Sequence, residues 1–340
     1  MLKPFIAKII KGVDLTQAEA EEAMAIVMRG DATQAQIGGY LVALRMKGET
    51  VEEIAGSAVA MRSVVNRVEI PSGKTGLIDT AGTGGDGSHS FNISTAAAFV
   101  IAGAGRQVAK HGNRAASSRC GSADVLAALG VDIDLTPEKV GDCIRETGIG
   151  FMFAPKFHPA MKHAIGPRVE LGQRTIFNIL GPLTNPAGAT HQLLGVFDPG
   201  LTEPMARVLG ELGGRAALVV HGDGGLDELT TGGPNRVSRL SGGEVATFDL
   251  DPAGYGLRPA SLEDLSGGEP VENAAIMRDL LSGRIAGPLA DVVALNAGAA
   301  LSLDDGDLAG GIALAQESLR SGAAAGKLDA LIEYSRGLAG

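Results

Sequence analysis

The chain has 340 residues, a formal net charge of −10 and 50 glycines. This length suffices for two domains, and the acidic balance excludes general binding to nucleic acid or to an anionic membrane, which needs a broad basic surface. No apolar run approaches the roughly 18 residues of a membrane span, and Cys120 and Cys143, without metal-ligand spacing or an export signal, are typical of a reducing cytoplasm.

Residues 1–70 are predicted to form a small helical domain. Apolar residues recur there at helical spacing, and the segments between them carry the start and stop signals of helices. The start signals are Thr16-x-x-Glu19, Thr33-x-x-Gln36 and Thr50-x-x-Glu53, and the stop signals are Gly30 and Gly48.

Residues 71–340 are predicted to form an α/β domain. Short apolar runs alternate there with helical segments, a pattern that predicts βαβ units and a mainly parallel central sheet flanked by helices. The expected strands lie at 77–79, 107–110, 149–154, 193–197 and 217–222. Residues 233–270 resemble a hairpin with loops, and the chain returns to helix after about 272.

The segment from Gly82 to Asp124 carries the strongest functional signal. Its Gly-rich stretches at 81–90 and 111–121 each follow a predicted strand and precede a helix, which places them at the carboxyl edge of the sheet. No acidic residue lies between Asp86 and Asp124, although four basic residues do. Backbone N–H groups at loop-to-helix junctions, together with a few cations, predict a site for a phosphate or diphosphate.

The pattern GxGxxG at residues 82–87 is weak by itself. A dinucleotide site also needs an acidic residue about 20 positions later, and this segment has none, so a nicotinamide cofactor is excluded. The remaining alternative is a tight turn, but Asn92, Ser94 and Thr95 at the next helix start favour phosphate binding. Gly73-Lys74-Thr75 resembles the end of a P-loop, yet residue 68 is Val and a strand follows, so that motif fails.

Lys110 at a strand end, followed by Gly and Ser residues, indicates a second anion-binding loop beside the first. The neighbouring His111 is either a general base or, the interpretation we favour, a hydrogen-bonding residue of the site wall. Asp227-Glu228 follows the strand at 217–222. Because a diphosphate substrate needs Mg²⁺, which takes oxygen ligands and commonly one or two carboxylates, this pair is a candidate metal site, with Asp223 a less certain neighbour.

At these residues the chain resembles the anthranilate phosphoribosyltransferases. The matching stretches are GTGGDG…FNIST, KHGNRAASS.CGSADVLAALG, FAPKFHPAMKHAIGPRVELGQRTIFNILGPLTNPA and HGDGGLDELT, in order between residues of about 80 and 230. The resemblance implies Mg²⁺-dependent transfer of the 5-phosphoribosyl group from phosphoribosyl diphosphate to anthranilate, in tryptophan biosynthesis. It also implies that helices around 160–185 return to the helical domain and that this domain forms a homodimer. Association with anthranilate synthase is left open.

The resemblance also assigns site residues, although no catalytic residue. Those implied to bind phosphoribosyl diphosphate are Gly82, Gly85, Asp86, Ser90, Asn92, Ile93, Ser94, Thr95, Lys110, His111, Gly112, Asn113, Arg114, Ala115, Ala116, Ser117, Ser118 and Ser122. Those implied to hold anthranilate are Gly82, Asn113 and Arg168. Those implied to bind two Mg²⁺ ions are Ser94, Asp227 and Glu228, with Glu228 shared. Two departures from the family pattern, Ser90 and Cys120, threaten none of these assignments.

Two other functions fit the same fold. A pyrimidine nucleoside phosphorylase would use inorganic phosphate, whereas HGNRAASS after Lys110 and the downstream Asp-Glu pair favour a diphosphate with metal. A nucleic-acid-binding relative would carry an extended basic surface and a degraded GTGGD or Asp-Glu motif, whereas this chain is acidic and retains both.

Overall fold

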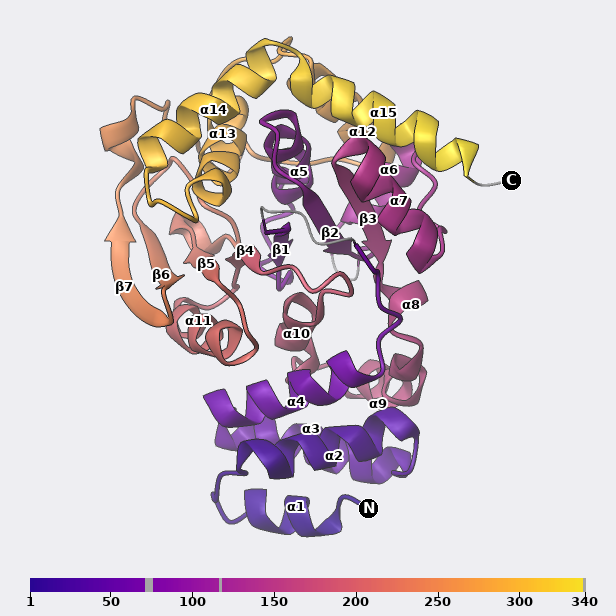
Figure 1. The fold of residues 1–340 in the computed structure, drawn as a ribbon. Helices are drawn as coiled ribbons and strands as arrows, with labels where there is room; N and C mark the ends of the chain where they lie inside the picture. The colour runs from indigo at the N-terminus through magenta and orange to yellow at the C-terminus, as the bar shows by residue number, and fades with distance from the viewer. Residues whose placement is uncertain (71–75, 116–117, 339–340) are drawn as a thin grey trace.

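The N-terminal helices form a separate layer at the bottom of Figure 1. In this computed structural model, which describes residues 1–70, 76–115 and 118–338, they are α1 (Lys3–Ile9), α2 (Gln17–Arg29), α3 (Gln34–Lys47) and α4 (Val51–Ser63). Thr16, Thr33 and Thr50 cap the starts of α2, α3 and α4, and Gly30 and Gly48 end α2 and α3. The predicted start and stop signals are therefore confirmed.

A buried carboxylate holds three of these helices together. Glu53 is 0% exposed and accepts hydrogen bonds from the backbone N–H groups of Leu15 and Thr50, both at 2.9 Å. Its second oxygen also pairs with Lys47 Nζ at 2.9 Å. Because a carboxylate removed from water must be paired, this network fixes how α2, α3 and α4 meet.

The larger part of the chain contains one seven-stranded sheet in the order β3-β2-β1-β4-β5-β6-β7. The first five strands in sequence are parallel, and β6 and β7 continue the sheet as an antiparallel hairpin. Their bounds are β1 (Ile78–Gly82), β2 (Val108–Gly112), β3 (Ile149–Phe153), β4 (His191–Gly195), β5 (Ala216–His221), β6 (Asn235–Ser241) and β7 (Glu244–Leu250). This confirms the predicted α/β class, the five strands and the hairpin. The strand order reverses between β1 and β4, where open α/β sheets form a ligand crevice.

Helices cover both faces of the sheet (Figure 1). One face packs against α5 (Ile93–Gly103) and α13 (Pro288–Leu301), and α11 (Thr202–Glu211) packs against β5, β6 and β7. The remaining larger helices are α6 (Ser122–Leu129), α7 (Pro137–Thr147), α12 (Pro270–Leu281), α14 (Leu308–Arg320) and α15 (Ala323–Gly337), and short turns are η3 (Pro199–Leu201), η4 (Asp223–Gly225) and η5 (Pro252–Tyr255).

The alternation of side chains along the strands divides the apolar interior into two cores. Leu193 and Val220 belong to the core beneath α5 and α13, whereas Leu194 and Val219 belong to a core shared with α11 and the N-terminal helices. Successive strand residues point to opposite faces. One continuous core therefore joins the helical layer to this face of the sheet, with α11 packed between α4 and the strands.

The segment between β3 and β4 crosses to the helical layer and returns. It consists of α8 (Ala154–Phe157), η1 (Pro159–His163), α9 (Ile165–Leu171), α10 (Phe177–Leu180) and η2 (Gly181–Thr184). Within it, η1 packs against α2, α9 against α3, and α10 and η2 against α4. We call it the return segment. Its path places residues near 168 and 174 between the two parts of the chain.

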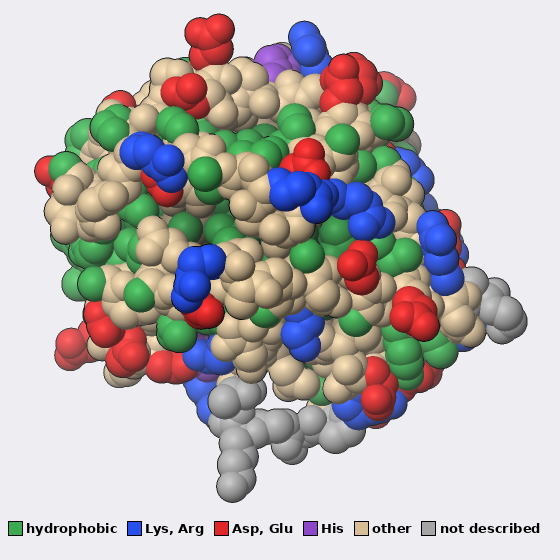
Figure 2. Space-filling view, turned by 90° about the horizontal axis from the view of Figure 1, so that it is seen from above, with side chains coloured by type: hydrophobic (Ala, Val, Ile, Leu, Met, Phe, Trp, Pro, Cys, Tyr) green, Lys and Arg blue, Asp and Glu red, His purple; other side chains and the backbone are tan. Residues whose placement is uncertain are grey.

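The end of the molecule farthest from the helical layer has mixed charge. Figure 2 shows acidic and basic side chains interspersed there, and several are paired, including Arg278 with Asp329 at 3.1 Å and Arg284 with Asp279 at 2.6 Å. Among the helices in the described ranges, none combines the length and apolarity needed to cross a bilayer.

The Glu53 network predicts a large cost for its removal. Glu53→Ala leaves Lys47 half-paired and two backbone N–H groups unsatisfied, so the free energy of unfolding should fall by about 3 kcal/mol. Urea unfolding followed by circular dichroism measures this change. The matched control is Glu52→Ala, an exposed carboxylate one position earlier in α4; equal effects of the two substitutions would contradict the assigned role of Glu53.

Candidate functional site

The crevice at the carboxyl ends of β1 and β4 brings together the Gly-rich stretch at 81–90, which we call the Gly-rich loop, and the pair Asp227-Glu228. Gly84 N–H donates to Asp227 Oδ2 at 2.7 Å, and Ser94 N–H donates to Glu228 Oε1 at 3.0 Å. Asp86 is joined to the same cluster, since its Oδ2 lies 3.4 Å from Asp227 N. Gly84 and Asp227 are 143 positions apart in the sequence, and Ser94 and Glu228 are 134 positions apart, yet each pair is in direct contact.

Two glycines make this contact sterically feasible. A Cβ on Gly82 would lie 2.4 Å from Asp227 Oδ2, and a Cβ on Gly195 would lie 1.5 Å from the Asp227 carbonyl oxygen. Such distances are far below van der Waals contact, so neither strand end tolerates a side chain. Glycine at the ends of β1 and β4 is therefore what lets the Asp227 segment approach the sheet.

The carboxylates of this cluster are costly to keep charged. Burial, together with the charge of Asp86, raises the pKa of Asp227 to about 7. Burial and the charge of Asp227 raise the pKa of Glu228 to about 8, although the cation of Lys110 opposes this. Removal of a carboxylate from water favours its neutral form. An additional cation would be strongly favoured here.

Lys110 is a buried cation on the opposite side of the cluster. Its Nζ donates to the Thr80 carbonyl at 2.6 Å and lies 3.4 Å from Ser94 Oγ. Burial lowers its pKa, and the carboxylates of Asp79 and Glu228 counteract that shift. The predicted strand-end lysine therefore lies at the base of the crevice and does not extend into solvent.

Asp79 supports Lys110 from within the sheet, and sequence reasoning missed it. Its carboxylate accepts hydrogen bonds from His111 N at 3.2 Å and Asn185 Nδ2 at 2.7 Å. Burial raises the pKa of Asp79 to about 6. The available signal was an aspartate inside the apolar run of β1, because a buried acid needs partners.

His111 forms a buried pair with His158, which sequence reasoning also missed. Their Nε2 atoms are 3.2 Å apart. Burial lowers the pKa of His111 to about 3 and that of His158 to about 4. Both rings are therefore neutral at pH 7, and one donates to the other. This favours the hydrogen-bonding role of His111 over general-base chemistry, which works best with a pKa near the working pH.

Asp124 closes the second loop. Its Oδ2 accepts hydrogen bonds from the N–H groups of Ala115 at 2.9 Å and Gly121 at 3.0 Å, and its Oδ1 pairs with Arg114 at 2.8 Å. Ser122 Oγ donates to the Asn113 carbonyl at 3.3 Å. The loop that follows β2 is thus tied to the start of α6. The predicted residues Ala116 and Ser117 lie outside the described residues.

The other predicted residues differ in exposure. Asn92 is engaged within the protein: its Nδ2 donates to the Cys120 carbonyl and its Oδ1 accepts from Asn273 Nδ2, both at 3.0 Å. Ile93 and Thr95 are buried at the start of α5. Ser90 and Gly112 are half-buried, whereas Gly85, Asn113 and Ser118 are exposed.

The return segment supplies Arg168, which lies on α9 with its guanidinium 5.2 Å from the centre of the Phe177 ring. The side chain is half-buried, and across the described residues its guanidinium makes neither a hydrogen bond nor an ion pair. Its planar fork is thus available to a carboxylate ligand. No group of three or more His, Cys, Asp or Glu side chains arranged for a metal occurs in the part of the chain that the structure describes.

Comparison with known proteins identifies the family. Residues 3–64 match the helical bundle domain of a glycosyl transferase family, and residues 74–325 match its a/b domain. The anthranilate phosphoribosyltransferase of Moorella thermoacetica is 54% identical and covers 98% of each chain, and that of Thioalkalivibrio sulfidiphilus is 52% identical over 97% of each. The chain belongs to the anthranilate phosphoribosyltransferase family.

Solved structures agree with this membership. The anthranilate phosphoribosyltransferase of Thermus thermophilus superposes with a TM-score of 0.92 at 49% identity, covering 97% of this chain and 99% of its own. That of Saccharomyces cerevisiae, in complex with PRPP and Mg, has a TM-score of 0.90 at 29% identity, with coverage of 99% and 98%. The resemblance seen in the sequence is confirmed: this is an enzyme that transfers the phosphoribosyl group to anthranilate in tryptophan biosynthesis.

Within this phosphoribosyltransferase, Arg174 joins the return segment to the Gly-rich loop. Its guanidinium lies 4.2 Å from the centre of the Phe197 ring and donates to the Gly85 carbonyl. Sequence reasoning missed Arg174, since an exposed arginine in a loop gives no local signal. The contact links the Gly-rich loop to the segment that carries Arg168.

The raised pKa values predict that the metal-free phosphoribosyltransferase loses stability as pH rises. A carboxyl with a pKa near 3.9 when unfolded and about 7 when folded binds its proton more tightly in the folded state, so the loss occurs between about pH 4 and 7. Asp227→Asn keeps the acceptor for Gly84 but removes the charge.

At pH 8 in EDTA, Asp227→Asn should therefore stabilise the protein by about 1 kcal/mol after allowance for solvent screening, or about 2 °C in Tm. The gain should vanish near pH 4.5. Differential scanning fluorimetry measures both values, with Asp223→Asn, an exposed neighbour, as the control. A lower Tm for Asp227→Asn than for the wild type at pH 8 would show that the protein stabilises the charged carboxylate of Asp227, and it would contradict the prediction.

Proposed function

We propose that the crevice between the Gly-rich loop, the loop after β2 and the Asp227-Glu228 segment holds phosphoribosyl diphosphate, and that Arg168 and Asn113 hold anthranilate beside it. The observation that carries the proposal is the placement of two poorly compensated carboxylates, Asp227 against the exposed glycine loop and Glu228 against the start of α5. The carboxylates need a cation beside them, and the backbone N–H groups of the loop suit an anion. A metal-bound diphosphate supplies both.

The phosphate-binding role of the two loops follows from their donors. Gly84 and Gly85 have φ of +67° and +76°, a conformation that glycine adopts readily and that lets the backbone of the loop approach a ligand closely. Lys110 adds a positive charge at the base. We assign the described members of the predicted set to this role and place Asn92, Ile93 and Thr95 behind the loop, where they position its backbone.

Mg²⁺ fits the donor set of the crevice. Asp227 and Glu228 offer carboxylate oxygens and Ser94 a hydroxyl, which are the hard ligands that Mg²⁺ prefers. The raised pKa of both acids shows that their charge lacks compensation. We propose two ions, with Glu228 shared between them. Bound Mg²⁺ would neutralise charge on the diphosphate leaving group.

The residues of the chain then act by positioning and by charge. In the reaction, the anthranilate nitrogen forms a bond to C1 of the ribose while the bond from C1 to the diphosphate oxygen breaks, and the nitrogen gives up one proton. An aryl amine is unprotonated at pH 7, so no strong base is required, which agrees with the neutral His111–His158 pair. Lys110 stabilises the departing charge, and Arg168 aligns the acceptor through its carboxylate.

The acceptor role of Arg168 predicts a selective kinetic effect. Arg168→Ala removes a bidentate, charge-assisted contact, so kcat/KM for anthranilate should fall about tenfold to hundredfold, while KM for phosphoribosyl diphosphate changes little. Anthranilate fluorescence during steady-state turnover measures both constants. Arg207→Ala, an exposed arginine paired with Glu203 on α11, is the control, and a larger effect on phosphoribosyl diphosphate would remove Arg168 from the acceptor site.

The metal role of the acid pair predicts a shift in Mg²⁺ dependence. Asp227→Asn combined with Glu228→Gln should raise the Mg²⁺ concentration for half-maximal activity by about tenfold or more, because ligand oxygens lose their charge. Asp223→Asn should leave the titration unchanged. An unaltered Mg²⁺ curve in the double variant would defeat the metal assignment.

We also propose a homodimer formed by the helical layer, with the domain boundary near residue 70 and a cytoplasmic location. Exposed apolar side chains occur on three elements that belong to that layer or pack against it: Met46 on α3 is 83% exposed, Val169 on α9 76%, and Ile10 after α1 70%. Apolar groups at this exposure on neighbouring helices mark an interaction face. The location rests on two buried, free cysteines, Cys120 and Cys143.

A charge on this face should dissociate the dimer. Met46→Glu combined with Val169→Glu places carboxylates at two separate points of the proposed interface, so light scattering should give half the wild-type mass. Leu314→Glu, on α14 and 54% exposed, is the control outside the face. A wild-type protein that is monomeric, or a double variant that stays dimeric, would contradict this interface.

A further inference from the structure

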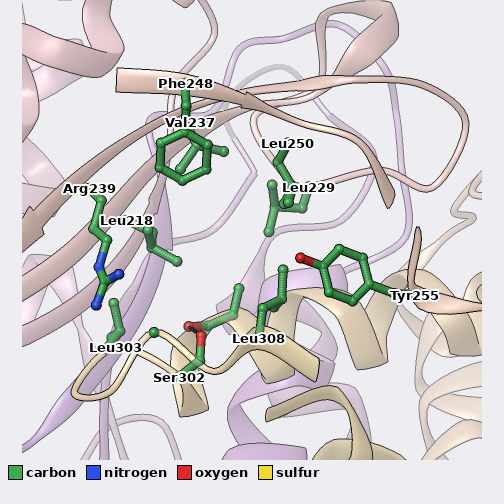
Figure 3. Close-up of a pocket in the computed structure, with 12 residues that line it drawn as sticks. Leu218, Leu229, Val237, Arg239, Phe248, Leu250, Tyr255, Ser302, Leu303 and Leu308 are labelled. Atoms are coloured by element: carbon green, nitrogen blue, oxygen red, sulfur yellow. Dashed lines mark hydrogen bonds between the residues drawn. The ribbon is translucent and has the colours of Figure 1, made fainter. Parts of the chain in front are cut away.

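A second cavity lies away from the crevice, between the antiparallel end of the sheet and the helices α13 and α14 (Figure 3). Its volume is about 130 Å³, and its walls are mostly aliphatic and aromatic, with Leu218, Leu229, Phe248 and Leu308 facing the space. An engineered apolar cavity of about 150 Å³ stays dry and binds benzene. The space is therefore suited to a single ring.

An unpaired cation borders this apolar space. Arg239 on β6 makes no hydrogen bond or ion pair to any other described residue. Its guanidinium lies against Gly306, where a Cβ would come within 2.5 Å of Nη1. The nearby acids are already engaged: Asp304 pairs with His191 and Arg106, and Asp305 accepts from Asp307 N. A bond from a backbone N–H does not neutralise a carboxylate, so acidic charge remains near Gly306, but no described acid forms an ion pair with Arg239.

The far end of the cavity offers one more polar group. In Figure 3 the Tyr255 hydroxyl points from η5 into the space, opposite Arg239. No hydrogen bond from it to other described residues occurs. Its oxygen is not a fully buried polar atom, so a ligand can reach it. A ligand with an apolar body, an anionic end and a polar substituent would satisfy the cation, the walls and this hydroxyl together.

We propose that this cavity binds a small single-ring carboxylate, with the ring against the leucines and Phe248 and the carboxylate on Arg239. An uncharged ring of the same size would fill the cavity and contact its apolar walls, but it would leave the guanidinium of Arg239 without an ion-pair partner. A phosphate would satisfy the cation and leave the apolar surface uncovered. The combination of a ring-sized apolar cavity and one arginine therefore selects an aromatic carboxylate.

The cavity is linked to the crevice by one residue. Leu229 lines the cavity and directly follows Glu228. The buried side chain of Asn296 on α13 bonds to both backbone groups of Leu229, accepting from its N–H at 3.0 Å and donating to its carbonyl at 2.8 Å. Ala299 on the same helix also lines the cavity. A ligand in the cavity would therefore shift the backbone that positions Glu228. An effect of that shift on the binding of phosphoribosyl diphosphate rests on the proposed metal role of Glu228.

The binding site is tested with benzoate as the probe and toluene as its uncharged counterpart. In methyl-labelled protein, benzoate should shift the NMR signals of Leu229 and Leu308, and Arg239→Gln should weaken this binding about tenfold, equivalent to ~1.4 kcal/mol. The matched control is Arg236→Gln on the opposite face of β6, where the arginine pairs with Asp249. Toluene should bind both Arg239 forms equally.

Benzoate that entered only the crevice would leave the Leu308 methyl signals unmoved, and that result would overturn the proposal. Equal benzoate affinity in the wild type and in Arg239→Gln would overturn it as well. Leu308→Trp, which fills the space from its rim, should abolish the cavity shifts while the transfer reaction continues.

The link to Glu228 is tested by calorimetry with phosphoribosyl diphosphate and Mg²⁺. Saturating benzoate should change the Kd of phosphoribosyl diphosphate by about fivefold in the wild type and not in Arg239→Gln, and by reciprocity phosphoribosyl diphosphate should change benzoate affinity by the same factor. An unchanged Kd would refute the coupling. Failure of phosphoribosyl diphosphate to bind in either protein would instead contradict the proposed function of the crevice.

Discussion

The approach of Asp227 and Glu228 to the Gly-rich loop is the constraint on which the site depends. Two carboxylates are held against backbone N–H groups at the carboxyl end of the sheet, with the buried cation of Lys110 as the nearest compensation. This arrangement destabilises the metal-free protein, because negative charge is withdrawn from water without enough positive charge to replace it. Under the proposed function, the same imbalance would favour the binding of a metal-bound diphosphate in the crevice. The crevice therefore lowers the folding stability of the metal-free protein at the place where a ligand would bind.

The helical layer completes the crevice because it shares a core with the sheet. Leu194 and Val219 on one face of the sheet pack in the same apolar cluster as the N-terminal helices. The return segment is anchored to that layer, and it carries Arg174 to the Gly-rich loop, with Arg168 on the same segment. Movement of the layer relative to the sheet would therefore alter both proposed substrate sites together.

The polar groups around the crevice favour positioning over proton transfer. His111 and His158 bond to each other and are kept neutral by burial, whereas Asp79 and Asn185 fix the strand ends that present Lys110 and His111. An aryl amine acceptor needs no strong base. The neutral pair His111 and His158, together with the cation of Lys110, is therefore compatible with this reaction. The cavity beside Leu229 adds a second place where a small carboxylate can act on the same acid segment.

The sequence by itself determined the local structure and the chemistry of the loops. Capping boxes at Thr16 and Thr50 specified helix starts and apolar runs specified five strands, because these properties depend on neighbours a few residues away. The loop composition predicted an anion site. The tertiary structure alone decided that Asp227 meets Gly82 and Gly195, that His111 is buried beside His158, and that Arg174 reaches Gly85. Those contacts join residues far apart in the chain, and they depend on strand order and on how one face of the sheet packs against the helical layer, which no local pattern encodes.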